Sequence, residues 1–165
     1  MYKKGELVIY GSSGVCIVED ITTMENAITK TSALYYVLRS KITTGGVAYV
    51  PVEGNVFMRP IMSKLQAESV VKKIPQIPTR EFENVSVRDA MRVYRDAINT
   101  HNVETAIGLI KHILKIEAKK KAQNKKLSST EERYLTLAKK IVESELTESL
   151  CMTSEELKTY VLQYV

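Results

Sequence analysis

Apolar and polar residues alternate with a two-residue period near the N-terminus, and the period becomes helical after residue 60. Four short runs rich in β-branched and aromatic residues are separated by Gly, Ser, Thr and Asn, at 5–10, 15–18, 35–39 and 47–52. Such residues favour strands, and the residues between them favour turns. With a fifth short run at 55–60, the pattern predicts a small antiparallel sheet curled into a barrel, while the polar stretch 22–33 is expected to cross its surface.

From Pro60 to the C-terminus the spacing predicts helices. A Ser or Thr followed three residues later by Glu, Gln or Asp marks a helix start, because each caps the other's backbone. These signatures begin at Ser63, Ser86, Ser128 and Thr153, and Asn102 opens a further helix. In the helix after Ser86, the spacing predicts a buried stripe on one face. The stripe comprises Val87, Met91, Tyr94 and Ile98.

The sequence pattern therefore predicts an α+β protein of two domains. Residues 1–60 are expected to form an SH3- or Tudor-like β-barrel, about the smallest all-β unit that can hold a core. Residues 61–78 are expected to be a helix and a linker that contains Pro75 and Pro78, since two prolines in four residues interrupt a helix. Residues 79–165 are expected to form an all-α helical bundle.

Charge is distributed unevenly along the chain. The formal net charge is +5. Residues 88–140 hold thirteen Lys and Arg against six Asp and Glu, whereas residues 141–165 hold one Lys against five Glu. A basic middle segment favours a polyanion partner such as nucleic acid. The competing interpretation is an ordinary solvated helix face.

Residues that would perform catalysis or bind a metal are few. Cys16 and Cys151 are too far apart in sequence for a zinc site and are interpreted as buried hydrophobes, and the histidines, His101 and His112, have no metal-ligand spacing. We therefore expect a binding protein rather than an enzyme, with no cofactor and no metal. No apolar run reaches the roughly 20 residues that span a bilayer, and the N-terminus lacks a signal-peptide core, so the expected location is cytoplasmic.

Several motifs together resemble the CarD/CdnL family of bacterial transcription regulators. In the N-terminal half they are Gly5-Glu6-Leu7-Val8-Ile9-Tyr10, Ser13-Gly14-Val15, Val18-Glu19-Asp20-Ile21, Tyr35-Tyr36-Val37-Leu38, Val50-Pro51-Val52 and Arg59-Pro60-Ile61. In the C-terminal half, the segment from Leu127 through Ser128, Glu131, Arg133, Leu135 and Ala138 to Leu146 is similar to the family's signature helix.

The resemblance implies a division of labour between the two domains. The Tudor-like barrel would dock on the β subunit of RNA polymerase, and the helical domain would lie over promoter DNA at the upstream edge of the transcription bubble and support open-complex formation. A free sheet edge can accept a partner strand, and basic helices can contact phosphates without reading sequence.

The chain departs from the family at positions that matter for these roles. The family's groove-wedging tryptophan is absent, and its position corresponds to Val87, which also fits the core stripe. Tyr49 replaces a polymerase-binding arginine in the fourth strand, and Met24 replaces the arginine before the third strand. Arg92 matches a basic family position, while Asp89 and Ala90 replace others. The resemblance therefore implies polymerase docking more directly than wedge-assisted bubble stabilisation.

The candidate site residues follow from these comparisons and from the charge pattern. The candidate polymerase-binding residues are Met24, Tyr49 and Pro51. The candidate DNA-binding residues are Val87, Arg88, Arg92, Arg95, Lys125, Lys126 and Arg133. The preferred hypothesis is a regulator that binds RNA polymerase and promoter DNA as a monomer. The alternatives are a protein-interaction module without a DNA role and an enzyme whose site the sequence does not reveal.

Overall fold

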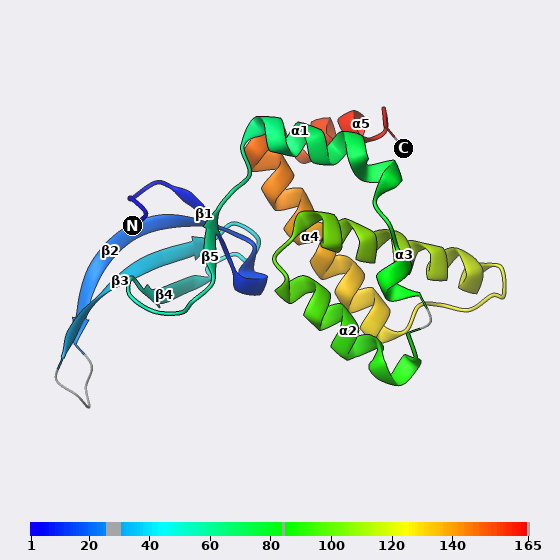
Figure 1. The fold of residues 1–165 in the computed structure, drawn as a ribbon, viewed down its shortest axis with the longest axis horizontal. Helices are drawn as coiled ribbons and strands as arrows, with labels where there is room; N and C mark the ends of the chain where they lie inside the picture. The colour runs from blue at the N-terminus through cyan, green and yellow to red at the C-terminus, as the bar shows by residue number, and fades with distance from the viewer. Residues whose placement is uncertain (26–30, 84, 165) are drawn as a thin grey trace. The chain divides into compact units, whose positions relative to one another are not determined.

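The computed structural model describes residues 1–25, 31–83 and 85–164, without the side chains of Arg80 and Val87. The chain divides into two compact units, Met1–Ile61 and Met62–Val165. Figure 1 shows that strands build the first unit and helices build the second. We refer to them as the sheet unit and the helical unit.

The sheet unit is one antiparallel sheet with the strand order β4-β3-β2-β1-β5. Its strands are β1 (Leu7–Tyr10), β2 (Val15–Glu25), β3 (Ser32–Ser40), β4 (Val47–Pro51) and β5 (Met58–Pro60). A short 3-10 turn, Gly11–Ser13, joins β1 to β2, and Gly11 and Gly14 both have positive φ, which costs glycine little.

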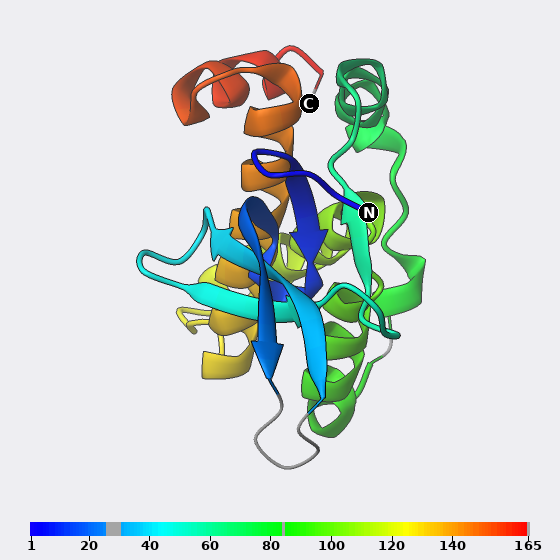
Figure 2. The ribbon, with the colours of Figure 1, turned by 90° about the vertical axis from the view of Figure 1, so that its left-hand side faces the viewer.

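The five expected strands are present, but the closed barrel is not confirmed. Among the described residues, β4 pairs with β3 and β5 pairs with β1, so the sheet is open at both edges. The expected surface connection over 22–33 is wrong, because β2 continues to Glu25 and β3 begins at Ser32. Residues 26–30 of that stretch lie outside the described part. Figure 2 shows β2 and β3 twisting together as a long antiparallel pair.

One face of the sheet carries the core of this unit. Val8, Val18, Leu38 and Val50 are at most 1% exposed and pack with Cys16 and Tyr36. Across β2 and β3, Val18 pairs with Leu38, and Leu38 in turn pairs with Ala48 of β4. Because neighbouring residues in a strand point to opposite faces, this burial fixes which residues of β2, β3 and β4 lie on the other face.

The described part of the helical unit contains five α-helices. They are α1 (Lys64–Lys73), α2 (Val87–Asn99), α3 (Val103–Lys121), α4 (Ser129–Leu150) and α5 (Ser154–Val161). The expected caps are confirmed: Ser63, Ser86, Asn102, Ser128 and Thr153 each accept a backbone N–H in the first helical turn. Local sequence signals therefore placed every helix start correctly.

Helix α4 contributes to both hydrophobic clusters of this unit. Val142 and Leu146 pack with α1 and α3, whereas Leu135 and Ala138 pack with α2 and α3. The predicted stripe on α2 is wrong in part, because Met91 is 56% exposed. The buried face of α2 instead contains Tyr94, Ala97 and Ile98, with Ala90 and Val93 partly buried beside them.

The segment with the two prolines, expected to be a linker, belongs to the helical unit and packs against α3. The segment contains two single 3-10 turns, η2 (Ile74–Gln76) and η3 (Arg80–Phe82). Ile77 and Phe82 are buried, and Lys111 Nζ of α3 donates to the carbonyl oxygens of Ile74, Pro75 and Ile77 at 2.8–3.1 Å. These contacts replace the helical hydrogen bonds that proline removes.

Candidate functional site

The face of the sheet opposite the core is lined by the residues that alternate with the buried ones. Val37 of β3 pairs with Tyr49 of β4, and Tyr35 pairs with Pro51. On β2, Thr22 pairs with Tyr35. We call this surface of β2, β3 and β4 the outer sheet face. Tyr49 is 55% exposed, so an apolar ring reaches solvent there.

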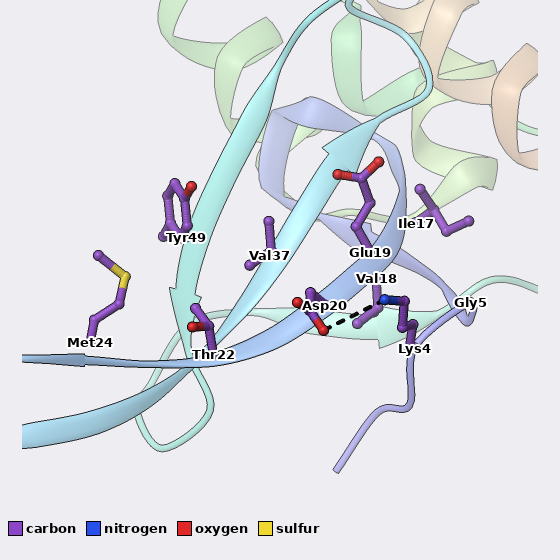
Figure 3. Close-up of a pocket in the computed structure, with 10 residues that line it drawn as sticks. All are labelled: Lys4, Gly5, Ile17, Val18, Glu19, Asp20, Thr22, Met24, Val37 and Tyr49. Carbon is purple, nitrogen blue, oxygen red and sulfur yellow. Dashed lines mark ion pairs between the residues drawn. The ribbon is translucent and has the colours of Figure 1, made fainter.

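A β-bulge hollows the outer sheet face. The register of β2 against β3 shifts between Val18 and Asp20, so Glu19 is the extra residue. Beside it lies a hollow of about 860 Å³, lined by apolar residues such as Ile17 and Val37 and by polar ones such as Glu19 and Thr22. Figure 3 shows Met24 and Tyr49 at one end of this hollow, and Lys4, in ion-pair contact with Asp20 at 3.7 Å, at the other.

The bulge also creates an ion pair that the sequence did not predict. Arg39 Nε of β3 donates to the Glu19 carboxylate. This hydrogen bond, together with the nearby positive charges of Arg39 and Lys4, lowers the pKa of Glu19 below its ordinary value. Residue spacing could not have revealed the pair, because it depends on the register of two strands. The ion pair and the Lys4–Asp20 pair give the hollow a charged margin.

The three predicted polymerase-binding residues lie on the outer sheet face. Met24 and Tyr49 both line the hollow. Pro51 follows Tyr49 by two residues in β4 and therefore lies on the same face. Met24 is 40% exposed. The fold thus gathers two apolar side chains that are 25 residues apart in sequence next to an edge strand.

Strand β4 ends the sheet on this side. Within the described part of the chain it is paired on one side only, with β3. Val47 and Tyr49 of this strand are 41% and 55% exposed. An edge strand with exposed apolar side chains can accept a strand from another protein, since its free N–H and C=O groups offer the hydrogen bonds.

The predicted arginines of α2 are exposed, but two of them are paired with acidic neighbours. Arg92 lies 3.8 Å from the Asp89 carboxylate and 3.7 Å from that of Asp96, and Arg95 also lies 3.7 Å from Asp96. Arg88 has no ion pair among the described residues. Helix α2 therefore carries three arginines whose charge is largely offset by two aspartates.

Positive charge is less compensated at the end of α3 and along α4. Residues 115–140 contain nine Lys and Arg against three Glu. Lys125 and Lys126 are exposed in the loop between the helices and line a hollow of about 370 Å³. The Arg133 guanidinium is also exposed and lies 5.9 Å from the ring centre of Tyr134. Lys121 pairs with Glu117 at 3.1 Å, and Glu117 and Glu132 line the same hollow, but the formal charge of this region is still more positive than that of α2.

One acidic residue in this region is held by hydrogen bonds. Lys120 Nζ donates to Glu131 at 2.6 Å, and the backbone N–H of Ser128 donates to the same oxygen at 2.6 Å. Burial raises the pKa of Glu131, but these hydrogen bonds outweigh it, so the pKa lies below its ordinary value. Glu131 is therefore ionised at neutral pH, and it neutralises one lysine while capping α4.

Val87, the predicted wedge residue, is the first residue of α2, and its side chain lies outside the described part. Met91, one turn later, is the exposed apolar residue on this helix that sequence reasoning assigned to the core.

The described residues contain no cluster of three or more His, Cys, Asp or Glu side chains that could hold a metal ion. Burial raises the pKa of the Cys16 thiol to about 11. Cys151, expected to be buried, is exposed because it ends α4 in a left-handed conformation. Among the described helices, none is long and apolar enough to cross a membrane.

Comparison with known proteins gives one family. Residues 2–62 match the family model described as the CarD-like/TRCF RID domain. The match ends one residue beyond the sheet unit, so it covers that unit and leaves the helical bundle outside. No curated protein matches the chain.

Proposed function

The sheet unit belongs to the CarD-like, RNA polymerase-interacting domain family, and from this premise we propose that the protein is a transcription regulator. In this proposal the sheet unit binds the β subunit of RNA polymerase. The helical unit contacts promoter DNA near the upstream edge of the bubble and changes the stability of the open complex. The protein acts as a monomer in the cytoplasm, without catalysing a reaction.

The observation that carries the proposal is the outer sheet face next to the free edge of β4. Its exposed apolar residues, Met24, Val47 and Tyr49, lie in the domain that the family model matches. A partner strand added along β4 would place its own side chains beside Tyr49 and above the hollow. Main-chain hydrogen bonds would supply affinity, and the hollow with its charged margin would supply specificity.

The proposed DNA contact rests on the charge of the helical unit. Lysines and arginines between residues 115 and 140 outnumber the acidic residues by three to one. Contacts of this kind hold a duplex through its phosphates and do not distinguish base sequences. This part of the proposal is independent of the family match, which stops at residue 62.

The alternative function is a protein-interaction module without a DNA role. It is favoured by the absence of tryptophan and by the pairing of Arg92 and Arg95 with aspartates on α2. Both hypotheses require polymerase binding or binding to another protein, so a binding experiment with polymerase comes first.

The proposal is tested by measuring binding of the purified protein to RNA polymerase, with a variant of the outer sheet face. Tyr49→Ala should weaken binding about tenfold, as expected when an exposed aromatic anchor is removed from an interface. Leu65→Ala in α1 is the matched control, because Leu65 is 79% exposed in the other unit and should leave affinity unchanged.

Circular dichroism of each variant must show an unchanged fold. If polymerase does not bind the wild-type protein, the proposed function is wrong. If Tyr49→Ala binds as tightly as the wild type, polymerase binds elsewhere on the protein.

A further inference from the structure

Each residue at the passage from the sheet unit to the helical unit has a strand partner or a hydrogen bond. Pro60 pairs with Val8 across β5 and β1, and the Ile61 N–H donates to the Leu7 carbonyl at 3.4 Å. The Met62 N–H donates to Glu145 Oε1 of α4 at 3.1 Å. Ser63 then caps α1. The covalent connection between the two units is therefore the Ile61–Met62 peptide.

Glu145 is unusual among the acidic residues because it is 0% exposed. A buried carboxyl group is costly unless it is hydrogen-bonded, and an amide buried without an acceptor is costly as well. The bond between them gives the Met62 N–H its acceptor and gives Glu145 Oε1 one donor. It spans 83 residues of sequence and ties the first residue of the helical unit to α4, a helix that contributes to both clusters of that unit.

The Met62 side chain strengthens this attachment. It packs against the cluster formed by α1, α3, α4 and α5, next to residues such as Val142 and Leu146. The reciprocal hydrogen bonds between Ser63 and Gln66 fix the following residue. Each residue from 60 to 63 thus has a hydrogen bond or a strand partner in its own unit.

We propose that Glu145 is a positioning residue that anchors the chain where it enters the helical unit. With this anchor, movement between the two units is confined to the backbone torsions at the Ile61–Met62 junction. The purpose of the anchor rests on the proposed function: a protein that holds polymerase and DNA together gains effective concentration from a short connection, and loses it when the connection lengthens.

The anchor can be tested in the full-length protein without polymerase or DNA. Backbone ¹⁵N relaxation gives a rotational correlation time for each unit separately. In Glu145→Ala, which removes the acceptor, the correlation time of residues 1–61 should decrease toward that of a separate domain. Glu145→Gln retains an oxygen acceptor for the Met62 N–H and should preserve the wild-type value.

Two further variants complete the design. Ser149→Ala is the matched control, since Ser149 lies one turn later on α4 and is also buried, without a bond to Met62 in the described structure. Two glycines inserted between Ile61 and Met62 provide the reference value for uncoupled units. Wild-type correlation times in a folded Glu145→Ala protein would overturn the proposal.

Glu145→Ala also leaves a cavity in the helical unit, and Glu145→Leu covers the case in which that cavity unfolds the unit. This variant removes the acceptor of the Met62 N–H and fills most of the space of the glutamate side chain. It should shorten the correlation time of the sheet unit as Glu145→Ala does, and an unchanged value would overturn the proposal equally.

A functional measurement separates this inference from the proposed function. The folded Glu145→Ala variant should keep wild-type affinity for polymerase alone and for DNA alone. It should lose the wild-type effect on open-complex lifetime, and Glu145→Gln should restore it. If wild-type protein has no such effect, the proposed function fails, and the relaxation data still decide whether Glu145 anchors the junction.

Discussion

Gly108 determines how closely the proline-containing segment can approach α3. A Cβ atom at this position would lie 2.9 Å from the Pro78 carbonyl oxygen and 3.4 Å from the Phe82 ring. The nearer atom belongs to the backbone, so it cannot move aside as a flexible side chain would. Glycine in a helix costs about 1 kcal/mol in propensity, and here the close approach outweighs that cost.

Gly108→Ala should therefore destabilise the protein by about 1–3 kcal/mol, as overpacking of a core does, despite the gain in helix propensity. Denaturant unfolding followed by circular dichroism measures the change. Ala118→Gly, at an exposed position on the same helix, is the control and should cost about 1 kcal/mol from propensity alone. If Gly108→Ala is more stable than the wild type, the Pro78 carbonyl does not restrict the side chain at position 108.

His112 is a titratable residue within the helical core. Its ring centre lies 5.7 Å from that of Phe82 and 6.1 Å from that of Tyr94. Burial lowers the pKa of His112 below its ordinary value, and nearby Lys115 and Lys119 act in the same direction. The acidic neighbours Glu83 and Glu131 oppose this effect without cancelling it.

The stability of the protein should decrease as the pH is lowered from about 6.5, the usual pKa of histidine. In that range the unfolded chain binds a proton that the folded His112 does not yet bind, so unfolding becomes more favourable. Unfolding free energies at pH 7.5 to 5 measure this for the wild type and His112→Gln. The difference in unfolding free energy between the wild type and His112→Gln should become smaller at low pH. If the unfolding free energies of the two proteins depend on pH in parallel, the prediction is wrong.

At the level of elements, α2 and the α3–α4 region compete as the DNA-contacting surface. Both carry exposed basic residues, but on α2 Asp89 and Asp96 lie within 4 Å of Arg92, and Asp96 also lies within 4 Å of Arg95. A phosphate approaching α2 would meet these two carboxylates as well. The loop that contains Lys125 and Lys126 offers cations whose charge is less compensated.

Two triple variants compare these elements at equal charge change. Replacing Lys125, Lys126 and Arg133 with Gln should make the salt slope of DNA binding shallower by about 0.9 for each phosphate that the protein no longer neutralises. The matched set replaces Arg88, Arg92 and Arg95 with Gln and should have the smaller effect. The opposite ranking, measured by fluorescence anisotropy with a promoter fragment, would assign the phosphate-binding surface to α2.

For the whole molecule, the two units carry different chemistry. The sheet unit presents exposed apolar groups at an edge strand, and the helical unit presents uncompensated positive charge. Protein binding and phosphate binding therefore depend on different surfaces, and salt should affect them differently.

The logarithm of DNA affinity should decrease linearly with the logarithm of salt concentration. Three phosphate contacts predict a slope of about −2.7. Binding to polymerase alone should respond less to salt, because the proposed contact uses main-chain hydrogen bonds along β4 and the exposed side chains of Met24, Val47 and Tyr49. If DNA affinity does not depend on salt, or if DNA does not bind even with polymerase present, the protein is a protein-interaction module without a DNA role.

The sequence by itself determined the local structure of this protein. Capping residues such as Ser63 and Ser128 act within a few residues, so every helix start followed from them. Alternating apolar residues indicated the five strands but not the full length of β2 and β3, and alternation also put Tyr49 and Pro51 on one face of β4. The ordered motifs of the N-terminal half indicated the CarD-like family, whose domain model matches residues 2–62.

Tertiary structure decided what depends on contacts between distant residues. The open sheet, the hollow beside the bulge and the Glu19–Arg39 pair follow from the register of β2 against β3. The packed proline segment depends on Lys111 and Gly108, more than 25 residues away. The bond from Met62 to Glu145 spans 83 residues. Local propensity carries no information on such pairs, because their energy arises only once the chain has folded.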